Sequence, residues 1–190
     1  SMLRSIFSKK FSFSTTYSYV HGTSSIPLEY STITRKFESI TNKFPDSIAL
    51  ISHHQEQQFT YEQMFDQANQ IAASLIALGL KPLDRIGIYS PNCSEWYLAQ
   101  LAASFANLIL VNINPAYQKS ELKYVLNKVE CKALITAHKL KSSNYIEMLN
   151  ELAPELKNSA PGELNSVDLP HLKTIIRIDY EIYQSCKSFP

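Results

Sequence analysis

The side chains that could do chemistry in this sequence are scattered along the chain rather than gathered into a catalytic set. His53 and His54 are adjacent, but they lie in a polar turn, and zinc would need further ligands at a defined spacing that the flanking residues do not supply. His21, His138 and His171 are isolated, and no serine lies in the G-x-S-x-G pattern that exposes a nucleophile at a strand-to-helix turn. We therefore predict that this chain contains no metal ligand and no catalytic residue.

Two carboxylates occupy positions where acids often act: Asp84 precedes a predicted strand, and Glu121 begins a predicted helix. Aspartate favours turns because its side chain bonds to nearby backbone amides, and a carboxylate near a helix N-terminus is stabilised by the helix dipole. We expect both acids to be structural. The single tryptophan, Trp96, shares a predicted helix with Leu98 and Leu101, so we expect it in the core or at a contact with another subdomain.

Nucleotide-binding α/β proteins commonly close glycine-rich loops around phosphate oxygens. The four glycines here, at 22, 79, 87 and 162, are too far apart to form G-x-G-x-x-G or a P-loop. Gly79 is expected to end a helix in the left-handed conformation, and Gly87 is expected to allow close packing against a strand. The pattern therefore argues against a dinucleotide-binding domain.

The composition is that of a globular protein, with 45% hydrophobic and 18% charged residues in a chain of 190. The net charge of +1 argues against a nucleic-acid partner. No apolar run approaches the ~20 residues that span a bilayer, so we predict no transmembrane segment. Cys93, Cys131 and Cys186 form no C-x-x-C pair, and we expect reduced thiols in an intracellular compartment.

Hydrophobic periodicity predicts an α/β fold. A helix at 31–44, a short β-hairpin at 48–61 and a helix at 62–78 come first. Strands then alternate with helices: the strands are 85–90, 108–113, 132–136 and 174–178, and the helices are 94–106, 119–129 and 142–152. This order implies right-handed crossovers and a mostly parallel sheet with helices on both faces.

Two local features are also predicted. Asn92 and Glu95 have the spacing of a capping box at the start of the helix at 94–106. Residues 154–171 contain three prolines and few large apolar residues, which indicates a surface loop.

Six short motifs occur in an order that resembles the acyl-CoA synthetases of the adenylate-forming, AMP-binding superfamily, most of all their mitochondrial medium-chain members. They are Tyr19-Val-His-Gly22, Phe59-Thr-Tyr61 with Met64, the segment from Gly79 to Ile88, Pro91-Asn92, Glu95-Trp96, and Asn112-Ile-Asn-Pro-Ala-Tyr117 with Glu121, Leu122 and Tyr124. The sequence departs from the family pattern at Leu83 and Asn107, where similar enzymes usually have glycine. We expect these two residues to cost local backbone freedom but not the fold.

The resemblance implies a two-step ligase. ATP and a fatty acid would give an acyl-adenylate and pyrophosphate, and the thiol of coenzyme A would then form the thioester. Similar enzymes bind ATP on a Ser/Thr/Gly-rich loop followed by Pro-Lys and hold Mg²⁺ with a downstream acid. The loop with Pro-Lys does not occur here, since Gly22-Thr-Ser-Ser25 is followed by Ile26-Pro27 instead. The resemblance therefore implies no catalytic, cofactor-binding or metal residue in this chain.

The predicted organisation has two parts. Residues 1–28 contain Arg4, Lys9 and Lys10 but no acid, are rich in Ser and Thr, and place Leu3, Ile6 and Phe7 on one face of a short helix. This composition predicts a mitochondrial transit peptide, with a flexible tail as the alternative, and hence a location in the mitochondrial matrix. Residues 29–190 are predicted to be the N-terminal subdomain of an AMP-binding domain, truncated before its ATP-binding loop.

Three functional hypotheses fit these observations. The first is the N-terminal fragment of a fatty acid–CoA ligase, inactive alone, whose partner is the remainder of its own synthetase domain. The second is a short non-catalytic binding or assembly module in mitochondria derived from that family. The third is an adenylating enzyme that does not use coenzyme A, although Asn112-Ile-Asn-Pro-Ala-Tyr117 favours an acyl-CoA synthetase.

Overall fold

The computed structural model describes residue 22 and residues 24–178. The chain divides after Tyr30, and all helices and strands below lie within residues 31–178. The predicted amphipathic leader helix, His21 and Cys186 lie outside the described residues. No helix in the described part of the chain is long and apolar enough to cross a membrane.

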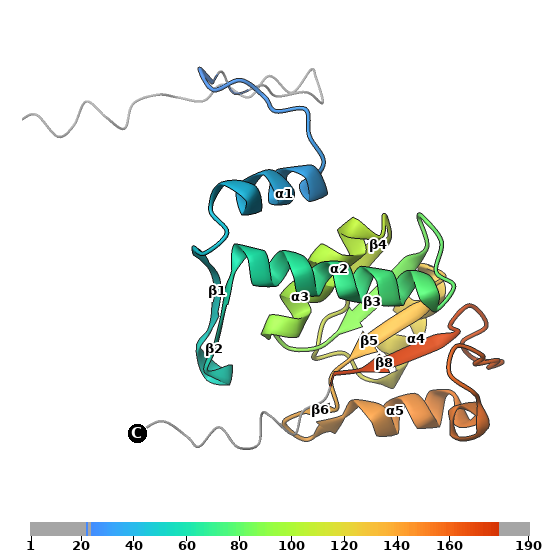
Figure 1. The fold of residues 1–190 in the computed structure, drawn as a ribbon. Helices are drawn as coiled ribbons and strands as arrows, with labels where there is room; N and C mark the ends of the chain where they lie inside the picture. Colours follow the sequence, from blue (N-terminus) through green and yellow to red (C-terminus); the bar gives the residue numbers. More distant parts are fainter. Residues whose placement is uncertain (1–21, 23, 179–190) are drawn as a thin grey trace, which may run out of the picture. The chain divides into compact units, whose positions relative to one another are not determined.

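Four parallel strands form the central sheet, in the order β4-β3-β5-β8 (Figure 1). The strands are β3 (Arg85–Tyr89), β4 (Ile109–Asn112), β5 (Ala133–Thr136) and β8 (Thr174–Arg177). In register, Ile86 of β3 pairs with Leu110 of β4 and Ala133 of β5. The predicted parallel sheet is confirmed, with β3 and β5 as its inner strands.

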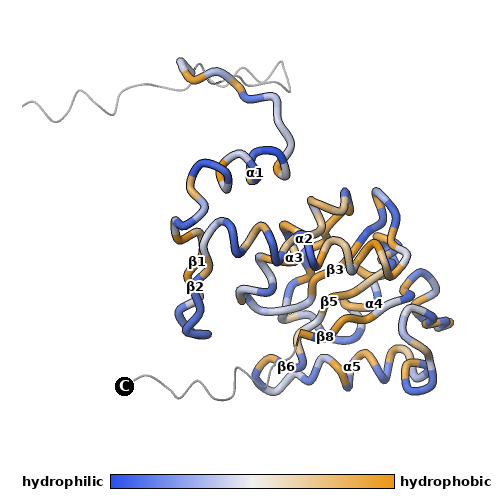
Figure 2. The backbone as a smooth tube through the Cα atoms, viewed as in Figure 1, coloured by the Kyte–Doolittle hydropathy of each residue, from blue (hydrophilic) through white to orange (hydrophobic). Residues whose placement is uncertain are grey.

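Helices cover both faces of the sheet, as predicted (Figure 1). On one face, Ile86 and Ile88 pack in a core with α2 (Tyr61–Ala77) and α3 (Ser94–Phe105). On the other face, Tyr89 and Leu134 pack with α4 (Lys119–Lys128) and α5 (Tyr145–Leu152). The inner strands therefore contribute to a core on each face, which is the pattern of a sheet covered by helices. Figure 2 colours the backbone along β3 and β5 as mainly hydrophobic.

The predicted N-terminal helix and hairpin are also present. Helix α1 (Ile33–Lys43) precedes β1 (Ile48–Ser52), the 3₁₀ turn η1 (His53–Gln55) and β2 (Gln57–Thr60). Phe37, Leu50 and Phe59 pack against buried Met64 of α2, so a third small core joins these elements to α2 and α3.

A buried glutamine attaches the hairpin to α3. The Gln55 side chain, only 4% exposed, accepts a hydrogen bond from the Ser94 amide at 2.7 Å and donates one to Glu95 Oε2 at 2.9 Å. Ser94 Oγ donates to Gln57 Oε1 at 2.7 Å. The hairpin thus satisfies polar groups in the first turn of α3 that would otherwise be unpaired.

Two predicted features at helix starts were wrong, namely the cap of α3 and the first residue of α5. The cap of α3 is Cys93, whose Sγ accepts a hydrogen bond from the Trp96 amide at 3.4 Å, so the predicted Asn92–Glu95 capping box does not form. Helix α5 begins at Tyr145 instead of 142, because a short hairpin of β6 (Lys139–Leu140) and β7 (Ser143–Asn144) occupies the preceding residues.

The segment at 154–171 is not simply a surface loop. It begins with a 3₁₀ helix, η2 (Pro154–Asn158). Leu164 and Leu169 are 2% and 0% exposed and belong to the core under α4 and α5. The leucines are too widely spaced to show a helical or strand period, so the sequence pattern missed their burial.

Leu83 and Asn107, the two positions where similar enzymes usually have glycine, both have the left-handed backbone that glycine favours. Leu83 has φ of +70° and Asn107 has φ of +55°. The Leu83 amide donates to the Asn107 carbonyl at 2.8 Å, so the two turns are directly bonded. The fold therefore tolerates a side chain at both positions, as expected, at an energetic cost of strain at Leu83.

We predict that Leu83→Gly raises the free energy of unfolding by about 0.5–1 kcal/mol, because relief of left-handed strain exceeds the entropy cost of glycine. Leu83 is 62% exposed, so little burial is lost. Asn107→Gly is the matched control and should change stability by less than about 0.5 kcal/mol, since asparagine tolerates this conformation. Urea unfolding measures both; a less stable Leu83→Gly protein would contradict the strain argument.

Candidate functional site

The carboxyl ends of the parallel strands are the first place to look for a ligand site. The chain runs from β3 to β4 on one side and later to β5 on the other side of β3. Open α/β sheets commonly bind ligands at such a point of reversal. Here the loops after β3, β4 and β5 meet, and their hydrogen bonds decide whether any polar side chain is available to a ligand.

Two buried tyrosines hold the loop after β4. The hydroxyl of Tyr89, at the end of β3, donates to the Tyr117 carbonyl at 2.5 Å, and that of Tyr145 donates to the Pro115 carbonyl at 2.6 Å. Their ring centroids are 4.0 Å apart. Asn114 Oδ1 accepts from the Ala116 amide at 2.9 Å and closes the turn. The motif at 112–117 is thus a rigid loop whose backbone is fixed by its neighbours.

The Tyr89 hydroxyl is a hydrogen-bond donor and not an acid at neutral pH. Burial, with a smaller effect from the Glu121 carboxylate, raises the pKa of Tyr89 to about 12. Glu121 itself accepts a hydrogen bond from the Gln118 amide at 3.1 Å at the start of α4. Its own backbone amide and that of Gln118 lower the pKa of Glu121. Glu121 therefore caps the start of α4, as predicted, in its ionised form.

Beside this loop lies a shallow open hollow of about 330 Å³, lined by Tyr117, Ser120, Glu121, Tyr124 and Val125. Tyr124 is 67% exposed. The walls of the hollow contain one carboxylate, that of Glu121, and are otherwise mostly apolar. The hollow therefore offers a contact surface but no set of catalytic groups.

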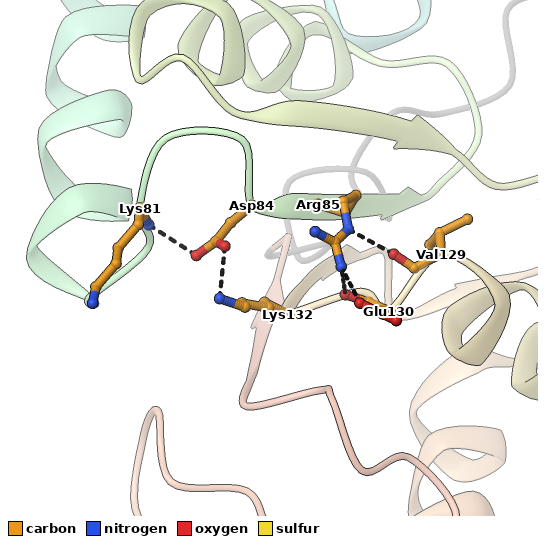
Figure 3. A network of polar contacts seen from close by, with 6 residues as sticks. All are labelled: Lys81, Asp84, Arg85, Val129, Glu130 and Lys132. Atoms are coloured by element: carbon orange, nitrogen blue, oxygen red, sulfur yellow. Dashed lines mark hydrogen bonds and ion pairs between the residues drawn. The ribbon is translucent and has the colours of Figure 1, made fainter.

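A second polar cluster lies at the opposite edge, where strands begin (Figure 3). Asp84 Oδ2 accepts from the Lys81 amide at 2.9 Å, and Oδ1 forms an ion pair with Lys132 Nζ at 2.6 Å. Arg85 Nε donates to the Val129 carbonyl at 2.8 Å, and Nη2 pairs with Glu130 Oε2 at 2.7 Å. These contacts join the turn before β3 to the turn before β5.

Asp84 is a structural acid, as predicted. The residue is 7% exposed, and burial on its own would raise the pKa of its carboxyl. The hydrogen bonds from Lys132 and the Lys81 amide, helped by the Arg85 charge, outweigh burial and hold the pKa of Asp84 below its usual value. Asp84 therefore remains ionised at neutral pH and stabilises the fold in that form.

We predict that Asp84→Asn lowers the free energy of unfolding by about 1–3 kcal/mol at neutral pH, because charge-assisted hydrogen bonds are lost. A lowered native pKa stabilises the protein above the unfolded-state value of 3.8 and ceases to do so as pH falls through the native value. The difference from wild type should thus be constant near pH 7 and shrink below about pH 4.

The control for this experiment is Asp46→Asn, at an exposed aspartate, which should change stability by less than about 0.5 kcal/mol at either pH. Denaturant titrations at several pH values supply the data. A difference between Asp84→Asn and wild type that persisted undiminished at pH 3 would contradict the ionised-carboxylate interpretation.

The remaining candidate residues do not converge. His53 and His54 are exposed in η1, His171 is exposed, and His138 is half-buried after β5. Among the described residues, no group of three histidine, cysteine or acidic side chains could hold a metal ion.

The two described cysteines are buried free thiols, as expected. Burial raises the pKa of Cys131 to about 11, and its Sγ donates to the Ala133 carbonyl at 3.0 Å. Cys131 is thus a neutral core residue and not a nucleophile.

Comparison with known proteins agrees with the fold and with the motifs. Residues 37–175 match the AMP-binding enzyme family. Over 163 residues the chain is 39% identical to the medium-chain acyl-CoA ligase ACSF2, mitochondrial, of Bos taurus, covering 86% of this chain and 26% of that protein. It is 34% identical over 151 residues to the putative acyl-CoA synthetase YngI of Bacillus subtilis, covering 80% of this chain and 28% of that protein.

Solved structures share the fold. A fatty acyl CoA synthetase of Mycobacterium tuberculosis superposes with a TM-score of 0.65 at 21% identity, covering 82% of this chain and 28% of that one. The N-terminal domain of FACL13 from the same organism gives 0.66 at 21% identity, covering 83% and 37%. The chain spans about a quarter of the length of the curated relatives it matches. On the match over residues 37–175, the chain belongs to the AMP-binding enzyme family.

Proposed function

We propose that this chain is the N-terminal part of an ATP-dependent medium-chain fatty acid–CoA ligase of the mitochondrial matrix, and that it has no ligase activity alone. The observation that carries the proposal is the similarity over 86% of this chain to relatives named mitochondrial medium-chain acyl-CoA ligases. Their names also support the mitochondrial location, together with the basic, acid-free leading segment.

The proposal places the ATP and Mg²⁺ sites outside this chain. Glycine-rich loops that hold nucleotide phosphates use consecutive backbone amides, whereas Gly79, Gly87 and Gly162 lie in separate parts of the fold. No described group of acids and histidines fits a metal ion. In the proposed ligase, ATP, Mg²⁺ and coenzyme A would therefore be bound by residues outside this chain, and we assign no chemical step to this part.

The proposed role of this part is to support the rest of the synthetase domain. The loop at 112–117 is held by two tyrosine hydroxyls at the carboxyl edge, and the hollow beside it is open and largely apolar. A rigid loop next to an exposed apolar surface suits contact with the remainder of its own domain.

A pair of measurements tests this proposal. The purified chain should show no fatty-acid-dependent exchange between ATP and pyrophosphate, whereas the full-length bovine relative, assayed alongside with octanoate, should exchange. The intact endogenous protein from a mitochondrial fraction should have a mass several tens of kDa above the 21.6 kDa of this chain.

The outcomes separate the hypotheses. Clear exchange by the purified chain would contradict the missing-site argument. A native mass slightly below 21.6 kDa would instead support a short mitochondrial module derived from the family. Absence from the mitochondrial fraction would contradict the proposed location.

A further inference from the structure

A second hollow, of about 430 Å³, lies at the amino edge of the sheet, away from the loops at 90–93 and 112–117. Its walls come from the turn after α2, the turn before β3, the turn before β5, and the segment that leads into β8. The strands that begin there are β3, β5 and β8, three neighbours in the sheet.

Positive charge dominates this hollow. Lys81, Lys132 and Lys173 line it together with His171, and Asp84 is the single carboxylate among its lining residues. Asp84 is paired with Lys132 at 2.6 Å. Among the described ion pairs, none involves Lys81 or Lys173. Lys81 and Lys173 thus line one concave surface without a described ion pair.

Hydrogen bonds hold the three segments that carry these lysines beside one another. The Lys81 amide donates to Asp84 Oδ2 at 2.9 Å, which ties the turn before β3 to the carboxylate that also binds Lys132 (Figure 3). The Lys132 carbonyl accepts from the Lys173 amide at 2.8 Å and from the Thr174 amide at 3.3 Å. The three lysine-bearing segments are therefore bonded in series, and their gathering is built into the sheet edge.

The charge arrangement indicates the kind of ligand. Three lysines against one carboxylate leave the lining residues of the hollow with an excess of positive charge, which attracts an anion. Lysine binds phosphate groups as a point charge with freely rotating donors. The residues that directly follow α2 also line the hollow, and the dipole at a helix C-terminus disfavours anions, so binding depends on the lysines. The ligand should therefore carry more than one negative charge.

We propose that this amino-edge hollow is a binding site for a small soluble phosphate-bearing anion, held chiefly by Lys81 and Lys173. Lys132 contributes donors while Asp84 keeps its ammonium in position. The site is separate from the carboxyl edge of the sheet, and it does not rest on the proposed ligase function.

Titration of the purified chain with inorganic pyrophosphate tests the proposal by calorimetry and by amide shifts in ¹H–¹⁵N NMR spectra. At about 50 mM salt we expect a dissociation constant below about 1 mM, with the amides of Gly162, Lys173 and Thr174 among those that shift. Lys81→Ala and Lys173→Ala should each weaken binding about fivefold or more, and the double variant should weaken it further.

Lys128→Ala is the matched control, because Lys128 is an exposed lysine on α4 that does not line this hollow. It should bind pyrophosphate as wild type does. Lys81 and Lys173 are exposed, so the Lys81→Ala and Lys173→Ala proteins should unfold at the wild-type temperature. No binding at 5 mM pyrophosphate, or equal binding by wild type and the double variant, would overturn the proposal.

Discussion

The fold depends on one strand being packed from both faces at once. Ile86 and Ile88 of β3 belong to the core under α2 and α3, and Tyr89 belongs to the core under α4 and α5. Between them, Gly87 leaves room for that second core: a Cβ there would lie 2.9 Å from Leu134 Cδ1 and 3.0 Å from Ile113 Cδ1. Because those side chains come from β5 and from the end of β4, the missing side chain of Gly87 lets both neighbouring strands pack across β3.

The ends of such a strand must still satisfy their polar groups, and this requirement accounts for the residues that look chemical in the sequence. At the start of β3, Asp84 forms an ion pair with Lys132 and accepts a hydrogen bond from the Lys81 amide. At the end of β3, the Tyr89 hydroxyl donates a hydrogen bond to the Tyr117 carbonyl. Unpaired buried polar groups cost more than paired ones gain. An acid and a phenol beside a parallel sheet therefore act first as structural donors and acceptors, and reactivity would need a further group that the described residues do not bring close.

The sequence predicted the parts of the fold that depend on local periodicity. Alternation of apolar strands and amphipathic helices was enough for the sheet and for the helices on both faces, and the bounds were mostly within a few residues. The misses depend on distant partners. Gln55 reaches the first turn of α3 39 residues away, and Leu164 and Leu169 find their core only once α4 and α5 have packed on the sheet. Cys93 replaced Asn92 as the cap because its side chain, and not that of Asn92, meets the free amide of α3.

The same division between local and distant partners explains why the lysine-lined hollow escaped sequence analysis. Lys81, Lys132 and Lys173 are evenly spread through the chain and look like ordinary surface residues. Parallel topology places the strand starts at one edge, so Lys132 and Lys173, directly before β5 and β8, become neighbours through a backbone hydrogen bond. Lys81, in the turn before β3, is joined to Lys132 through the Asp84 side chain. One lysine near a strand start is commonplace, whereas lysines near the starts of three neighbouring strands create a local positive field. The three lysines come together only because β3, β5 and β8 are neighbours in the sheet, and this strand order cannot be seen in a short stretch of sequence.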